Sequence, residues 1–123
     1  MRLNYLMIFV SDMQRAVAFY RDVLGLPLRF ESPQWTEFET GGATLALHPS
    51  ADAADMMDDP DGVPAGRCRP GLAVPDLDAF HHRMEEKNVR CVQPPTELHG
   101  ACIARYLDPD GLCISVGEER RAS

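Results

Sequence analysis

The chain has 123 residues, 45% of them hydrophobic, which is enough for one compact globule or for two small modules that share a core. Its formal net charge of −7 argues against binding to nucleic acid, whose phosphates need a basic surface. Since there is neither an apolar run of membrane-spanning length nor a signal-peptide pattern at the start, we expect a cytoplasmic protein that has no membrane partner.

The first half of the chain predicts a strand followed by an amphipathic helix. The strand-like run covers residues 3–10, and the apolar residues after it recur at the spacing of one helix face. Ser11 with Gln14 is typical of a capping box at the helix start, and Gly25 predicts a left-handed stop. The apolar stripe consists of Met13, Ala16, Val17, Tyr20, Val23 and Leu24.

Three more short strands are predicted after this helix, at residues 26–31, 35–40 and 43–48, with turn signals between them. Residues 49–66 then form an acidic linker without a basic residue. We interpret the linker as a solvated connector; a lid whose Met56 and Met57 contact a ligand is the alternative. Its aspartates lack the spacing of a calcium loop.

The second half repeats this order. A strand is predicted at residues 68–74, and then a helix whose apolar stripe is Leu77, Phe80 and Met84, with Asp76 capping its start and Asn88 ending it. The remaining strands are predicted at residues 89–92, 101–107 and 112–117, with turns at Pro94-Pro95 and at Asp108-Pro109-Asp110-Gly111.

Both halves are therefore predicted to fold as strand–helix–strand–strand–strand, which indicates an internally duplicated α+β protein. We place the first module at residues 1–48, the linker at 49–66, the second module at 67–118 and a tail at 119–123. A module of this size is marginally stable alone, so the two modules are expected to pack against each other.

All cysteines lie in the second half, one on each of its predicted strands. No pair has the close spacing of a zinc site, so we interpret them as reduced, buried and hydrophobic. A structural metal, a redox role and a disulfide are the alternatives. The four are Cys68, Cys91, Cys102 and Cys113.

Residues 10–26, with the sequence VSDMQRAVAFYRDVLGL, closely resemble the first helix of the vicinal oxygen chelate superfamily. This is the group of glyoxalases, bleomycin-resistance proteins and extradiol dioxygenases. Residues 42–47 and the turn at 108–111 resemble the ends of its two modules. The resemblance implies two tandem βαβββ modules whose mixed sheets form a cup with the helices outside. A ligand, usually with a divalent metal, would lie in the cleft between the modules.

In this superfamily each module supplies metal ligands from its first and fourth strands. Those positions fall here on Tyr5, Ala46, Pro70 and Ser115, with Arg69 in place of Pro70 if the register slips by one. Apart from the Tyr5 phenol, these side chains are poor ligands for a divalent cation. We therefore expect no metal and no other cofactor.

Side chains two apart on a strand share a face, so the resemblance also predicts the lining of the cleft. Trp35 and Arg105 are further candidates, although the sequence does not fix which way they face. His81 and His82 are expected on the surface. No nucleophile elbow or phosphate-binding loop is present, so no catalytic residue is assigned. The predicted lining is Tyr5, Met7, Ala46, His48, Cys113 and Ser115.

The favoured hypothesis is metal-free binding of a small organic molecule by a homodimer of the bleomycin-resistance type. The acidic surface is compatible with a neutral or cationic ligand. One alternative is an enzyme that uses relocated metal donors such as His48, Tyr5 and His99, or metal-free acid–base chemistry. A regulatory or assembly partner with an empty cleft is another.

Overall fold

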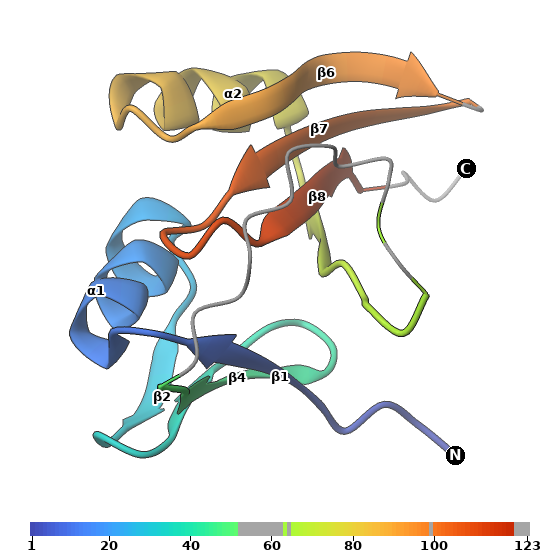
Figure 1. The fold of residues 1–123 in the computed structure, drawn as a ribbon. Helices are drawn as coiled ribbons and strands as arrows, with labels where there is room; N and C mark the ends of the chain where they lie inside the picture. Colours follow the sequence, from blue (N-terminus) through green and yellow to red (C-terminus); the bar gives the residue numbers. More distant parts are fainter. Residues whose placement is uncertain (52–62, 64, 99, 120–123) are drawn as a thin grey trace. The chain divides into compact units, whose positions relative to one another are not determined.

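The computed structural model describes residues 1–51, 63, 65–98 and 100–119, in two units, Met1–Asp55 and Met56–Ser123 (Figure 1). The linker aspartates, the Met56-Met57 pair and His99 lie outside the described residues. The first unit contains β1 (Tyr5–Val10), α1 (Met13–Ala18), the π-helix η1 (Phe19–Val23), β2 (Leu28–Glu31), β3 (Thr36–Phe38) and β4 (Thr44–Pro49). The second unit contains β5 (Gly71–Val74), α2 (Leu77–Glu86), β6 (Cys91–Leu98), β7 (Ala101–Leu107) and β8 (Cys113–Glu118).

The two units have the same topology. Each holds a four-stranded mixed sheet, in the order β1-β4-β3-β2 or β5-β8-β7-β6. The first and last strands of each module pair in parallel, β1 with β4 and β5 with β8, and the other pairs are antiparallel. The predicted α+β class and the tandem βαβββ duplication are confirmed. None of the helices in the part of the chain that the structure describes has the length and apolarity needed to cross a membrane.

In the first unit one face of the sheet is buried under α1 and η1. Tyr20 of η1 lies with its ring 6.1 Å from that of Phe38 on β3, and the Thr36 hydroxyl donates to the Met13 sulfur at 3.4 Å. Strand alternation brings this face together, because every second residue of β1, β3 and β4 points the same way. The residues buried in this layer are Ile8, Val10, Ala16, Val17, Phe19, Tyr20, Leu24, Thr36, Phe38, Leu45 and Leu47.

The start of α1 differs from the prediction. Asp12, not Ser11, is the N-cap, and its Oδ1 accepts from the backbone N–H of Arg15 at 3.1 Å. Both residue types cap well, but the carboxylate also interacts favourably with the positive end of the helix dipole. The Ser11 hydroxyl instead accepts from the Arg15 guanidinium at 3.0 Å. Gly25 has φ +86°, which confirms the predicted left-handed stop.

The second unit is built on the same principle. The Asp76 side chain accepts from the N–H of Ala79 at 3.1 Å, and Asn88 has φ 57°, so both predicted ends of α2 are confirmed. The stripe of Leu77, Phe80 and Met84 is buried, and the Phe80 ring lies 5.7 Å from that of Tyr106 on β7. The sheet buries Ala104, Tyr106, Ile114 and Val116.

Two predictions about the second unit were wrong. Pro94-Pro95 does not form a turn but lies inside β6, where the register is irregular between Gln93 and Thr96. β6 is an edge strand that pairs only with β7, and the register shift leaves both prolines out of the ladder, so their missing N–H groups are tolerated. His81 is not a simple surface residue: its side chain is 19% exposed and its Nδ1 lies 2.8 Å from the Tyr106 hydroxyl. His82 is on the surface, as predicted.

The cysteines also differ from the prediction. None of the four forms a disulfide, but none is buried either: Cys68 and Cys91 are exposed, and Cys102 and Cys113 are partly exposed. Cys68 is not on a strand, since β5 begins only at Gly71. Cys91 lies on the edge strand β6.

The Asp-Pro-Asp-Gly turn is held by a buried carboxylate. Asp108 is 5% exposed, and its Oδ1 accepts from the N–H of Asp110 at 2.9 Å and of Leu112 at 2.8 Å. Gly111 has φ +84° and donates its N–H to the Asp108 carbonyl at 2.9 Å. The turn therefore depends on the side chain at its first position, as in other Asx turns.

Replacing Asp108 with alanine is expected to lower the free energy of unfolding by about 2 kcal/mol, because two backbone donors lose their acceptor. Asp108→Asn retains the Oδ1 acceptor and is expected to lose less than about 1 kcal/mol. Urea denaturation followed by circular dichroism measures both variants. Equal losses would show that the charge of Asp108, and not its acceptor oxygen, stabilises the turn.

Candidate functional site

The face of the first sheet opposite α1 carries most of the predicted lining from that half of the chain. The parallel register of β1 and β4 places Tyr5 beside Thr44, Met7 beside Ala46 and Phe9 beside His48. Directly paired residues share a face, so these side chains lie on the side away from the helix. Tyr5 is 49% and Phe9 59% exposed, which is unusual for side chains of this size.

Aromatic rings are in contact across this face. The Tyr5 and Trp35 ring centroids are 5.8 Å apart and the ring planes meet at 85°. His48 contacts Trp35 at 6.5 Å and Phe9 at 5.7 Å. These edge-to-face arrangements are the favourable ones for aromatic pairs. We call the group formed by Tyr5, Phe9, Trp35 and His48 the aromatic face.

The sequence left open which way Trp35 faces. In the structure both its backbone and its indole form hydrogen bonds. Its backbone N–H donates to the Ser32 hydroxyl at 3.0 Å, and that hydroxyl donates to the Trp35 carbonyl at 2.8 Å. Its indole Nε1 donates to Glu37 Oε2 at 2.9 Å. Trp35 lies just before β3, and not within it as predicted. Its ring thus belongs to the aromatic face.

Glu37 joins Trp35 to a charged network on the same side of the sheet. Its Oε1 accepts from Arg29 Nη2 at 2.7 Å, and Arg29 Nη1 donates to Glu39 at 2.8 Å. Arg29 also donates to the Thr44 hydroxyl. The hydrogen bond from Trp35, followed by that from Arg29, lowers the pKa of Glu37 below its ordinary value. The carboxylate therefore stays charged at neutral pH and fixes the indole.

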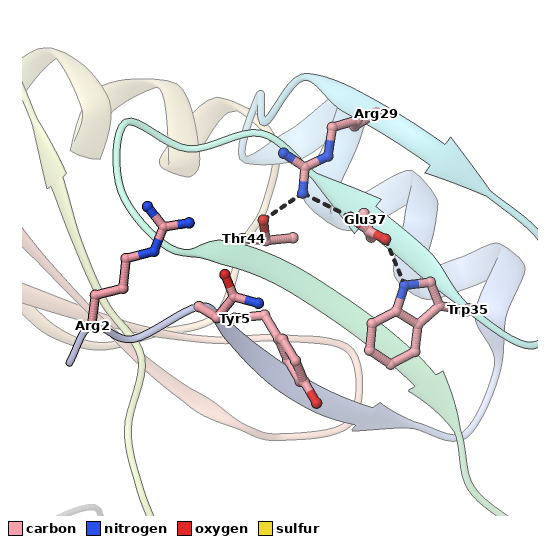
Figure 2. Close-up of a pocket in the computed structure, with 7 residues that line it drawn as sticks. Arg2, Tyr5, Arg29, Trp35, Glu37 and Thr44 are labelled. Carbon is pink, nitrogen blue, oxygen red and sulfur yellow. Dashed lines mark hydrogen bonds and ion pairs between the residues drawn. The ribbon is translucent and has the colours of Figure 1, made fainter.

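A pocket of about 430 Å³ adjoins the aromatic face in the first unit (Figure 2). Its volume falls within the range of about 300–1,000 Å³ that is typical of small-molecule sites. Tyr5 and Trp35 are the predicted lining residues that belong to it. The sequence interpretation missed five others. These are Arg2, Asn4, Arg29, Glu37 and Thr44.

Alternation along β3 and β4 could have identified Glu37 and Thr44, since each is two positions from a predicted residue, Trp35 and Ala46. Arg29 could not have been found in this way. The register of β2 shifts between Leu28 and Phe30, so simple alternation fails at that point.

His48 is constrained by its own backbone neighbourhood. Its Nδ1 lies 2.7 Å from the Pro49 carbonyl. A carbonyl oxygen only accepts, so Nδ1 carries the proton in this contact. In the neutral ring this leaves Nε2 as the free acceptor.

In the second unit the other predicted residues share one face of the sheet. The register places Arg105 beside Ser115 and Leu107 beside Cys113, which fixes the direction that the sequence left open for Arg105. These three candidates, Arg105, Cys113 and Ser115, are all partly exposed.

The positions corresponding to the family's metal ligands do not suit a divalent cation. Since Met7 pairs with Ala46 and Gly71 with Ser115, the counterpart of Tyr5 in the second unit is Arg69, and not Pro70 as first predicted. An arginine is no better as a metal ligand, because it is a permanent cation without an acceptor. The described residues also contain no group of three or more His, Cys, Asp or Glu that could hold a metal ion.

The sequence comparison agrees with this fold. Residues 2–116 match the sequence model of the Glyoxalase/Bleomycin resistance protein/Dioxygenase superfamily. The chain belongs to this superfamily. Among curated proteins it is similar to YraH of Bacillus subtilis (strain 168), itself uncharacterized, with 25% identity over 94% of this chain and 97% of YraH.

Solved structures of the superfamily share the fold. Lactoylglutathione lyase from Agrobacterium tumefaciens superposes with a TM-score of 0.73 at 24% identity, covering 94% of this chain and 92% of the lyase. TnmS3, an antibiotic binding protein from Streptomyces sp. CB03234, superposes with a TM-score of 0.73 at 23% identity, covering 98% of this chain and 97% of TnmS3. At such identities the likeness is one of fold.

Trp35 is the only tryptophan, so its fluorescence reports on Glu37. As the pH falls, protonation of Glu37 is expected to weaken the carboxylate contact and change the emission, with a midpoint below the ordinary value of 4.5. Emission excited at about 295 nm is followed from about pH 7 to about pH 3. The transition should be absent in Glu37→Gln; a midpoint above 4.5 in the wild type would contradict the assignment.

Proposed function

We propose that this protein binds a small organic molecule on the aromatic face and in the adjoining pocket, without a metal ion. The observation that carries this proposal is the group of mutually contacting rings, two of them exposed and two half-buried, beside a pocket of about 430 Å³. Exposed apolar groups gathered in one place are typical of binding sites, whereas singly scattered ones are ordinary. The rings of Tyr5 and Trp35 would contact the apolar part of the ligand.

The metal-free part of the proposal is supported by what the nearby donors already bind. Both oxygens of Glu37 accept hydrogen bonds, from Arg29 and from Trp35. Nδ1 of His48 faces the Pro49 carbonyl. A metal ion would have to displace the contacts of Glu37 to gain a carboxylate ligand, and Nε2 of His48 is a single remaining donor. A metal site needs at least three protein ligands, so relocated donors are an unfavourable basis for the enzyme alternative.

The superfamily fold supports a contribution from the second module. In our proposal Arg105, Cys113 and Ser115 are the ligand-contacting residues of the second unit, and the protein acts as a cytoplasmic homodimer. That TnmS3 is an antibiotic binding protein is consistent with a binding role, whereas the lactoylglutathione lyase represents the enzymatic branch.

The binding proposal is tested with three matched biphenyl probes: 4-phenylbenzoate, 4-phenylbenzyl alcohol and 4-phenylbenzylammonium. At least one is expected to bind and to change the fluorescence of Trp35. Tyr5→Ala should weaken that binding about tenfold, because a ring contact is lost. His48→Ala should weaken it by a smaller factor, since His48 contacts Trp35 from the other side.

His82→Ala is the matched control, because His82 is an exposed histidine on α2. It should leave both affinity and fluorescence unchanged. If none of the three probes binds, or if the Tyr5 and His48 variants bind as the wild type does, the proposed site is wrong.

The metal-free proposal is tested by metal analysis after purification without chelator, and by thermal shift with Mn, Ni, Zn and Fe(II). We expect substoichiometric metal and no increase in melting temperature, because a ligand that binds the native state must stabilise it. A stoichiometric metal, or clear stabilisation by one of these ions, would support an enzyme with relocated ligands. Probe binding should also survive addition of EDTA.

A further inference from the structure

The pocket in the first unit differs chemically from the aromatic face that it adjoins. It is lined by two guanidinium groups, Arg2 and Arg29, and by one carboxylate, Glu37. We infer that this pocket binds an oxyanion, such as a carboxylate, carried by the aromatic ligand, with Arg2 as its ion-pair partner. The inference rests on the proposed function and narrows the ligand to aromatic acids.

The carboxylate that lines the pocket is already hydrogen-bonded through both of its oxygens. Glu37 receives Arg29 on one oxygen and the Trp35 indole on the other. Glu39, which does not line the pocket, binds the second terminal nitrogen of Arg29. Both oxygens of Glu37 therefore have partners, so a ligand cation would have to compete for them. Arg29 shares its charge between two carboxylates and has none left for a ligand anion.

Hydrogen-bond donors remain. The Thr44 hydroxyl accepts from Arg29, so its own hydrogen is available to a ligand. Asn4 contributes an amide to the lining, with two more donors. These neutral donors suit the lone pairs of an oxyanion.

Arg2 supplies the charge that the network does not use. It lines the pocket but forms no hydrogen bond or ion pair with the residues that the structure describes. Figure 2 shows the side chains of Arg2 and Arg29 on two sides of Thr44, with Tyr5 between Arg2 and Trp35. An arginine presents a planar fork of donors that matches a carboxylate in two parallel bonds.

This local arrangement outweighs the charge of the whole chain. The net charge of −7 suggested a neutral or cationic ligand. Charges beyond the Debye length of about 8 Å are largely screened at physiological ionic strength, whereas a guanidinium in contact with the ligand is not. The residues lining the pocket therefore decide the sign of the ligand.

The ring and the anion must belong to one molecule. Tyr5 and Trp35 line the pocket together with Arg2 and Thr44, so an oxyanion bound there has aromatic side chains within its immediate surroundings. An inorganic anion would leave those rings in water. A flat aromatic carboxylate would cover them and reach the guanidinium at the same time.

The three biphenyl probes differ mainly in the charge of one substituent, so their affinities test the inference. Measured by Trp35 fluorescence and calorimetry, 4-phenylbenzoate should bind at least about tenfold more tightly than 4-phenylbenzylammonium, with the alcohol between them. Raising NaCl from about 50 mM to about 500 mM should reduce the affinity for 4-phenylbenzoate, so that it approaches that for the alcohol, whose own affinity should not fall.

Arg2→Gln should weaken the binding of 4-phenylbenzoate about fivefold. Its affinity for the alcohol should stay within about twofold of that of the wild type. Arg2→Lys should restore part of the loss. Arg15→Gln is the control, since it removes the same charge from α1, on the other side of the sheet. Sulfate, which offers the oxyanion without the ring, should compete poorly.

The outcomes separate the two proposals. If the alcohol or the ammonium binds as well as the carboxylate, or if Arg2→Gln has no selective effect, the oxyanion inference is overturned while the binding proposal stands. If sulfate displaces the probe at equal concentration, the pocket is a simple anion site and the aromatic part is wrong. If no probe binds, both proposals fail.

Discussion

Each four-stranded sheet has one continuous helical segment, α1 with η1 in the first unit and α2 in the second, and one such segment can cover only one face. This constraint determines the rest of the molecule. Strand alternation sends Ile8 and Val10 under α1 and sends Tyr5 and Phe9 to the opposite face, where they stay exposed. The sheet thus separates a hydrophobic core from a surface on which large rings are available for a ligand. The duplicated second unit obeys the same rule.

The exposed face is kept in order by polar contacts. A buried ring is fixed by packing, but Trp35 lies at a surface and is fixed by Ser32 at its backbone and by Glu37 at its indole. Arg29 in turn fixes Glu37. Exposed ion pairs contribute little to the free energy of folding. Their effect here is to restrict the orientation of the indole, so that less conformational entropy is lost when a ligand binds.

Sequence patterns predicted the features that depend on local periodicity. The apolar stripes, the Asp76 cap, the Gly25 stop and the order of the strands follow from rules that act within a few residues. The prediction of Ser11 as the N-cap of α1 was wrong, because the adjacent Asp12 is an equally suitable capping residue. The sequence pattern could not predict Arg2 and Arg29 as pocket residues, since Arg29 lies at a register shift and Arg2 lies before the first strand. Their proximity arises from strand pairing across the sheet, which periodicity does not encode.

The loss of the metal position at Ala46 and the presence of Glu37 fit together physically. The antiparallel register places Ala46 directly opposite Glu37. A carboxylate metal ligand at 46 would stand beside the carboxylate of Glu37, and like charges in that position are destabilising unless a cation binds between them. With a methyl group at 46, Glu37 is free to pair with Arg29 and to hold Trp35. The same strand pair can therefore support a metal centre or an ordered aromatic surface, and this sequence has the residues of the second.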